Sequence, residues 1–458
     1  MAVAPPDSKP KSSGLSALMR PVNSVVERFI PSALAFAIVL TFVVAILALI
    51  LTDSGPVEVI NGWGDGLSGL LAFMTQMALI LLLGHTLANT GPVRKVLAKL
   101  GGLPNTVLQA YLFVFLIAAV ASLITWGLGL VVGVLVAKEV AEQGRQKGLN
   151  LHFPMLVAAG YSGYVIWHMG YSGSGTLTAA TEGSFIAEQL GRTIPISETT
   201  FSWWNLTAIA VTIVVVGVAL ALVAPRSGDK IIELGFDARN TETVEDDVVT
   251  PADRVDASRI LTLLVGLALV AYIVIHYVQG GTAGLDIVNW TFLALIFLLV
   301  RNPFELITLI KNAASNVGEI LLQFPLYAGI MGIMATTGLI TIFSDVVVSV
   351  ATPATFGVLA FLSAGVVNFF VPSGGGQFAV QGPIMLDAAE RLGVDPAVAI
   401  MAIAYGDQWT NMIQPFWALP VLAIAALKMR DILGYTMVTL IASGIVFAAT
   451  MLLVGAGV

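Results

Sequence analysis

Apolar stretches long enough to cross a lipid bilayer recur along almost the whole of this 458-residue chain. A membrane-spanning helix needs about 20 consecutive, mostly apolar residues. Only 11% of the residues are charged and the mean hydropathy is +0.92, whereas about 25% of residues are charged in ordinary soluble domains. The alternating patterns of about ten residues that mark membrane strands are missing. The sequence therefore predicts an all-α polytopic membrane protein.

Two stretches in the second half interrupt apolar runs with proline, glycine and polar side chains. The first is Val371-Pro372-Ser373-Gly374-Gly375-Gly376-Gln377, and the second runs from Tyr405 to Pro415. Proline removes a backbone donor, and we expect the three glycines to leave the helix. Because an unpaired backbone group is costly in hydrocarbon, such breaks are tolerated only where protein or a water-filled cavity surrounds them. Both breaks therefore predict a functional site.

Two regions hold two apolar arms around a glycine-rich middle, and we predict that each is a re-entrant helical hairpin. Residues 105–143 have Trp126-Gly127-Leu128-Gly129 at their centre, and residues 354–391 contain the proline and glycine break. A predicted broken helix follows each hairpin, at residues 153–179 and 396–427. Two full spans in place of each hairpin stay an open alternative, because they would leave the charge distribution of the loops unchanged.

Charged residues set the predicted layout of the remaining chain. Residues 1–28 read as a cytoplasmic tail, residues 224–259 as an acidic cytoplasmic linker and residues 260–279 as an extra transmembrane helix. With the N-terminus inside, every Lys and Arg except Arg192 and Arg391 falls on the cytoplasmic side, as the positive-inside rule requires. The chain has no cysteine, which excludes disulfides, thiolate metal sites and cysteine nucleophiles. We expect no cofactor, no structural metal and no nucleic-acid partner.

The two halves of the chain resemble each other when they are aligned at one constant offset. The matched positions that carry most weight are Gly129 with Gly375, Arg145 with Arg391, and Gly160 with Gly406. The first repeat, residues 29–223, starts in the cytoplasm, and the extra helix reverses the second, residues 280–458. Inverted repeats with interrupted helices are the best sequence indication of a secondary transporter with a site at the membrane midplane.

The first-half counterpart of the Tyr405 break is dense in glycine and hydroxyl groups. Its candidate substrate-binding residues are Ser162, His168, Ser172 and Ser174. With an ordinary pKa of about 6.5, His168 could bind a carboxylate when protonated or carry a coupling proton. A neutral histidine bonded to a neighbouring helix is the alternative. Neither break contains Lys or Arg, so an anion would be held by neutral donors, half-helix ends or His168.

In the second half, Asp407 is the one acid that we place deep inside a broken helix. It could take up a proton or, with Asn411 nearby, help to bind Na⁺; it could also cap the helix at the break. The hairpin residues Ser373, Gly374, Gly375, Gly376 and Gln377 could clamp a substrate through close backbone approach. Tight packing between helices is the alternative for these small residues.

The two breaks, with Gln381-Gly382-Pro383 between them, resemble the short-chain fatty acid transporter family of the ion transporter superfamily, over nearly the whole chain. The resemblance implies uptake of short monocarboxylates such as butyrate or acetoacetate across a bacterial inner membrane, driven by H⁺ or Na⁺. It also implies an elevator-type fold and a homodimer embedded in membrane lipid. The family positions that carry over as binding residues are Ser373 to Gln377 and Gly406 to Asn411, a range that includes Asp407, Gln408, Thr410 and Asn411.

Three other functions remain open. A Na⁺/H⁺ exchanger of the same superfamily could use Asp407 alone, and another small carboxylate could be the cargo. Gly160-Tyr161-Ser162-Gly163 and Gly170-Tyr171-Ser172-Gly173 resemble the Gly-x-Ser-Gly motif of rhomboid intramembrane proteases. Four residues make a weak motif, and a serine nucleophile also needs a base within hydrogen-bond reach.

Overall fold

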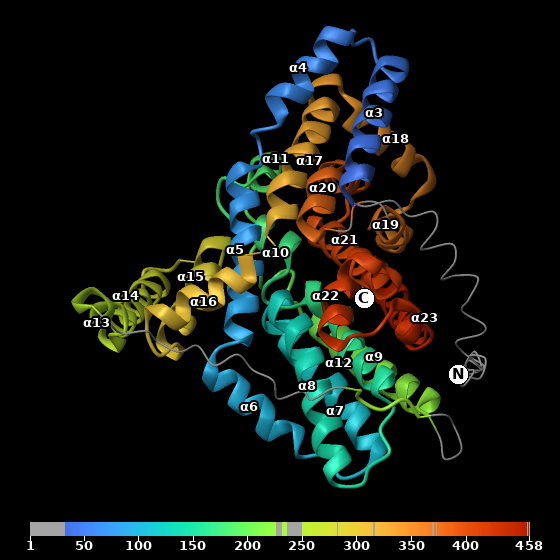
Figure 1. The fold of residues 1–458 in the computed structure, drawn as a ribbon. Helices are drawn as coiled ribbons and strands as arrows, with labels where there is room; N and C mark the ends of the chain where they lie inside the picture. Colours follow the sequence, from blue (N-terminus) through green and yellow to red (C-terminus); the bar gives the residue numbers. More distant parts are fainter. Residues whose placement is uncertain are drawn as a thin grey trace, which may run out of the picture.

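The computed structural model describes residues 33–225, 231–235, 250–281, 283–314, 317–368, 371, 373–455 and 457. Throughout that part of the chain all regular secondary structure is helical, which confirms the all-α prediction (Figure 1). The predicted N-terminal tail, residues 1–28, lies outside the described residues, as does most of the acidic linker.

Six helices of the described chain are long and apolar enough to cross a membrane. They are Leu71–Ala88, Val107–Ile124, Trp203–Val223, Arg259–Val278, Ile320–Thr337 and Met429–Gly455. Their lipid-facing sides carry large exposed apolar side chains: Leu222 is 68% exposed and Ile445 is 66% exposed. Such exposure is unfavourable in water and favourable in hydrocarbon, so these helices have the surface of a multi-pass membrane protein.

Two pairs of adjacent helices occupy the regions predicted as hairpins. Hairpin 1 consists of α7 (Val107–Ile124) and α8 (Trp126–Gln146), which pack together and are joined at an extended Thr125. Hairpin 2 consists of α19 (Pro353–Asn368) and α20 (Gly374–Leu392). The prediction that the three glycines of hairpin 2 leave the helix is wrong, because they form the first turn of α20. Gly127 and Gly129 of hairpin 1 also lie within a helix, α8. Glycine occurs within these helices because neighbouring groups occupy the space that a side chain would need.

Two interrupted helices follow the hairpins. The first contains α9 (Phe153–Gly163), the 3₁₀ turn η1 (Tyr164–Met169) and, after an irregular segment, α10 (Ser174–Ala180). The second contains α21 (Pro396–Thr410), the 3₁₀ turn η2 (Asn411–Ile413) and α22 (Pro415–Ala425). The two cross where they are interrupted, since η1 and α10 both contact α21. The two halves of the chain therefore meet at their irregular backbone.

Glycines allow each hairpin to lie directly on its interrupted helix. A Cβ on Gly160 of α9 would lie 2.6 Å from the carbonyl oxygen of Gly133 in α8. A Cβ on Gly406 of α21 would overlap the carbonyl of Phe361 in α19. Small residues at helix crossings let backbones approach closely in membrane proteins. The glycines Gly160 and Gly406, on which the predicted repeat partly rests, thus have a packing role.

The remaining helices surround this core (Figure 1). At the top of the view α3 (Ala33–Leu51) and α4 (Pro56–Gly66) pack on α17 (Gly318–Thr337), with α18 (Leu339–Val350) beside them. To the left are α13 (Pro251–Asp256), α14 (Arg259–Val278), α15 (Leu285–Leu299) and α16 (Pro303–Ala314). The others are α5 (Leu71–Ala88), α6 (Gly91–Gly101), α11 (Phe185–Leu190), α12 (Trp203–Val223) and α23 (Met429–Gly455).

Candidate functional site

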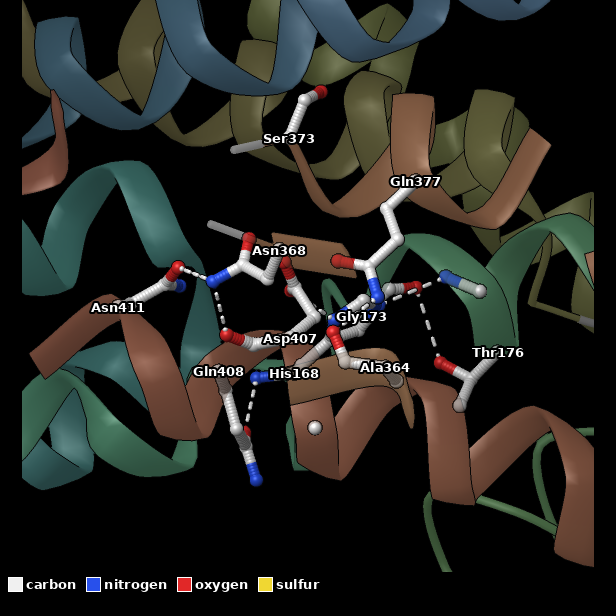
Figure 2. A network of polar contacts seen from close by, with 12 residues as sticks. His168, Gly173, Thr176, Ala364, Asn368, Ser373, Gln377, Asp407, Gln408 and Asn411 are labelled. Atoms are coloured by element: carbon white, nitrogen blue, oxygen red, sulfur yellow. Dashed lines mark hydrogen bonds and ion pairs between the residues drawn. The ribbon is translucent and has the colours of Figure 1, made fainter. Parts of the chain in front are cut away.

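A histidine and an aspartate, one from each half of the chain, form a fully buried pair at the crossing of the interrupted helices. His168 of η1 places its Nδ1 2.7 Å from Oδ2 of Asp407 in α21, and neither side chain has any exposed surface. The backbone N–H of His168 donates to Oε1 of Gln408 at 2.9 Å (Figure 2). The structure thus brings together three residues that the sequence predicted separately as site residues.

A second hydrogen bond fixes which nitrogen of His168 carries the proton. The backbone N–H of Gly175 donates to Nε2 at 3.0 Å, so Nε2 acts as an acceptor and carries no proton in this arrangement. The ring proton is therefore on Nδ1 and is donated to the carboxylate of Asp407. Oδ2 of Asp407 accepts this hydrogen bond, while its Oδ1 has no hydrogen-bond partner in the described chain.

Asn368, at the end of α19, is the centre of the hydrogen bonds around the second break, and the sequence reasoning missed it. Its Nδ2 lies 2.8 Å from the carbonyl oxygen of Asp407 and 2.7 Å from Asn411 Oδ1 (Figure 2). The same nitrogen lies 2.9 Å from Thr410 Oγ1. The backbone carbonyl oxygen of Asn368 accepts a hydrogen bond from Gln414 Nε2 at 2.8 Å. An isolated amide in an otherwise apolar arm was the signal that could have found it.

Substituting Asn368 by leucine is expected to lower thermal stability, since it leaves three buried acceptors without their donor. Each buried acceptor left unpaired costs about 1–3 kcal/mol, so we expect a clear fall in the unfolding midpoint of the detergent-solubilised protein. Ser349→Ala is the matched control, because Ser349 is exposed and its hydroxyl bonds only the backbone one turn away. Equal midpoints for the Asn368 variant and this control would contradict the central role of Asn368.

The hairpin residues that were predicted to bind substrate have clear structural partners. Ser373 caps α20, its Oγ accepting from the N–H of Gly376 at 3.2 Å, and Figure 2 draws it apart from the buried network. Gln377 joins the two arms of hairpin 2, donating from Nε2 to the carbonyl of Ala364 at 2.8 Å and to Gln381 Oε1 at 3.0 Å. The cap and this bond hold the start of α20 in place.

Each of the three glycines that open α20 faces a different aromatic neighbour. An added Cβ would lie 2.5 Å from Cη2 of Trp167 at Gly374, and 2.9 Å from Cζ of Phe73 at Gly375. At Gly376 it would lie 2.6 Å from Cδ2 and Cε2 of Tyr327. None of the three has a positive φ. The triplet is therefore explained by close approach of rings to the helix and not by an unusual backbone conformation.

The three predicted serines of the first half lie in different surroundings. Ser172 Oγ accepts from the backbone N–H of Trp126 at 3.0 Å and so ties the irregular segment to the turn of hairpin 1. Ser174 is buried at the start of α10. Ser162 instead shares a 2.7 Å hydrogen bond with Thr439 of α23. Its hydroxyl is therefore bonded to α23, and no hydrogen bond joins it to the His168–Asp407 pair in the described chain.

Several buried polar atoms around the crossing have no hydrogen-bond partner among the described residues. Four are acceptors: Asp407 Oδ1, Asn368 Oδ1, Gln377 Oε1 and Gln414 Oε1. Two are donors: Gln408 Nε2 and Asn411 Nδ2. Buried polar groups in native proteins are almost always bonded. Such a concentration of unpaired polar atoms is what we expect of a site that binds a polar ligand.

The arrangement of buried carboxylate, broken helices and free polar atoms is that of a membrane transport site, and comparison with known proteins agrees. The family model for "Short chain fatty acid transporter" matches residues 14–454. The chain belongs to the short-chain fatty acid transporter family. Members of this family are transporters, so the alternative of an intramembrane serine protease, with Ser162 or Ser172 as nucleophile, is wrong.

Two bacterial relatives of the family align with almost the whole chain. A protein of Escherichia coli (strain K12), proposed to be a short-chain fatty acid transporter, is 39% identical over 434 residues, which are 94% of this chain and 98% of its own. A protein of Haemophilus influenzae (strain ATCC 51907 / DSM 11121 / KW20 / Rd), also proposed to be a short-chain fatty acid transporter, is 36% identical over 444 residues. The match covers 94% of this chain and 98% of the relative.

Two solved transporter structures share the fold at low sequence identity. The YdaH transporter of Alcanivorax borkumensis superimposes with a TM-score of 0.57 at 14% identity, over 92% of this chain and 98% of its own. MtrF of Neisseria gonorrhoeae, from a class of antimetabolite efflux pumps, gives 0.55 at 18% identity, over 94% and 97%. This family member therefore has the fold of a known group of membrane transporters.

Proposed function

We propose that this protein takes up short-chain fatty acids or related small monocarboxylates, such as butyrate and acetoacetate, by symport with H⁺ or Na⁺. In this proposal it lies in a bacterial inner membrane with its N-terminus in the cytoplasm and acts as a homodimer. Hairpins 1 and 2 are re-entrant, the two halves are inverted repeats, and the hairpins move with the interrupted helices in an elevator-like cycle. The family and the crossing of the two interrupted helices support this architecture.

One observation carries the proposal of cation coupling. The carboxylate of Asp407 is fully buried, and only its Oδ2 is bonded, to a neutral His168, while Oδ1 has no partner in the described chain. An uncompensated negative charge in a membrane-buried site is unfavourable. A proton on Oδ1, or Na⁺ beside it, would remove the charge without disturbing the bond between Gly175 and His168. In this proposal Asp407 receives the coupling cation, and His168 orients it.

The surroundings of Asp407 favour a singly charged cargo. Among the described residues, no lysine or arginine is buried, so two carboxylates of a dicarboxylate would lack a basic partner. One carboxylate can be held by neutral donors and by the start of a helix. We assign substrate contact to the start of α20, residues 373–377, and to Gln408 and Asn411, whose amide N–H groups lack acceptors. Thr410 belongs to the same network through Asn368.

Uptake of radiolabelled butyrate into proteoliposomes under an imposed inward H⁺ or Na⁺ gradient tests this function. We expect accumulation above the equilibrium level with one of the two gradients, and none in protein-free vesicles. The gradient that works identifies the coupling ion. Cation exchange without any butyrate uptake would contradict the proposal and would support the Na⁺/H⁺ exchanger instead.

A further inference from the structure

Four aromatic rings from three elements close into a ring beside the His168–Asp407 pair. We call them the aromatic quartet: Trp126 at the start of α8, Tyr164 and Trp167 in η1, and Trp417 in α22. In order around the ring, the centroid distances are 6.1 Å from Trp126 to Trp167, 5.7 Å from Trp167 to Tyr164, 6.0 Å from Tyr164 to Trp417 and 5.5 Å from Trp417 to Trp126. The quartet joins hairpin 1 to both interrupted helices.

Three polar groups of the quartet are buried donors without an acceptor in the described chain. They are Nε1 of Trp126, Nε1 of Trp167 and the hydroxyl of Tyr164. These side chains are at most 4% exposed. Buried tryptophan and tyrosine usually find a partner for their N–H or O–H, and leaving a donor unpaired is costly. Three such donors in one cluster indicate an acceptor that comes from a ligand.

The stacking of the rings selects an anion over a cation. The Trp167 indole stacks on Tyr164 with an interplanar angle of 13° and on His168 with an angle of 14°, at centroid distances of 5.7 Å and 4.2 Å. Aromatic faces are negative and aromatic edges are positive. Because the faces of Trp167 are taken by these neighbours, its positive edge is what remains to meet a ligand.

That edge lies against the start of α20. A Cβ on Gly374 would lie 2.5 Å from Cη2 and 3.1 Å from Cζ2 of Trp167, on the side of the ring that also bears Nε1. The first N–H groups of a helix and its partial positive charge favour anions. The indole N–H of Trp167 and the start of α20 therefore both favour an anion at the place where hairpin 2 approaches the quartet.

We propose that the aromatic quartet binds the carboxylate end of the substrate, through the N–H groups of Trp126 and Trp167 and the hydroxyl of Tyr164. The short alkyl chain then lies against Trp126 and Trp417, the two rings of the quartet whose contacts are tilted or edge-on and not stacked. The inference rests on the proposed transport of monocarboxylates and assigns the residues that hold the single carboxylate. A second carboxylate among these rings would have no basic partner.

Isothermal titration of the detergent-purified protein with sodium butyrate tests the site. Tyr164→Phe removes one hydroxyl and keeps the ring. Replacing Trp167 by β-(3-benzothienyl)alanine keeps the bicyclic shape and removes only the N–H. A hydrogen bond to a charged group is worth about tenfold or more in affinity, so we expect each change to weaken butyrate binding by at least about tenfold.

Trp203→Phe is the matched control, since Trp203 lies at the start of α12, outside the quartet, and is 64% exposed. Its butyrate affinity should equal that of the wild type. If the wild type binds butyrate and the Tyr164 and Trp167 variants bind it equally well, the aromatic site is wrong while the proposed function stands. An equal loss in Trp203→Phe would also overturn the site. A wild type that neither binds nor transports butyrate would overturn the proposed function itself.

Discussion

Replacing Asp407 by asparagine is expected to reduce gradient-driven butyrate uptake to the level of protein-free vesicles. The asparagine Oδ1 can still accept the hydrogen bond from His168 Nδ1, which spans 2.7 Å in the wild type, so the buried geometry is retained. What is lost is the charge that a coupling cation neutralises. Exchange of labelled for unlabelled butyrate, which needs no net cation movement, should therefore continue in the variant. Initial rates of uptake and of exchange in proteoliposomes measure the two effects separately.

Asp345→Asn is the control for this experiment. Asp345 forms an ion pair with Arg391 on the surface, where its side chain is 57% exposed, and exposed pairs contribute little to stability. Its uptake should match the wild type under the same gradient. Gradient-driven accumulation that persists in Asp407→Asn would mean that the coupling cation enters elsewhere.

Substituting Gly374 by alanine is expected to slow butyrate uptake on the order of tenfold, although alanine favours helix by about 1 kcal/mol relative to glycine. The new methyl group would lie 2.5 Å from Cη2 of Trp167 and 3.1 Å from Cε1 of His168. Either α20 or the indole must move, and both touch the proposed substrate site. Helix propensity alone predicts that the alanine variant is more stable than the wild type. A fall in its uptake therefore comes from the steric contact and not from loss of the helix.

Gly64→Ala provides the matched comparison. Gly64 is also a helical glycine, in α4, and an added Cβ there has no atom within 4 Å. This variant should transport like the wild type and should be equally stable or slightly more so. If Gly374→Ala also transports normally, the close contact between hairpin 2 and Trp167 has no part in the cycle.

Much of the helix layout could be predicted from the sequence because lipid imposes simple demands. Each apolar run had to be a helix, and the glycine and proline interruptions had to be enclosed by protein. The same reasoning singled out Asp407 and His168 as polar residues inside interrupted spans, and the structure joins them at 2.7 Å.

The sequence did not predict in which direction each helix points its side chains. Ser162 lies in the expected segment but bonds Thr439 of α23, a long-range choice that local pattern does not encode. We predicted that the three glycines of α20 break the helix, but they are helical. These residues are glycine because the rings of Trp167, Phe73 and Tyr327 occupy the space that side chains would need. Contacts with distant parts of the chain decided both cases. Short helices such as α4 and α18 were missed because they are too short to give a spanning signal.

The contact of Gly375 and Gly376 with aromatic rings has a mechanical consequence. Phe73 of α5 and the residues Phe324 and Tyr327 of α17 meet α20 where it presents only backbone and Cα hydrogens. Helices normally interlock by ridges seated in grooves, and sliding them apart requires side chains to climb over one another. At this point α20 has no ridge, so in the proposed elevator-like cycle hairpin 2 would slide past these rings without interlocking side chains having to separate.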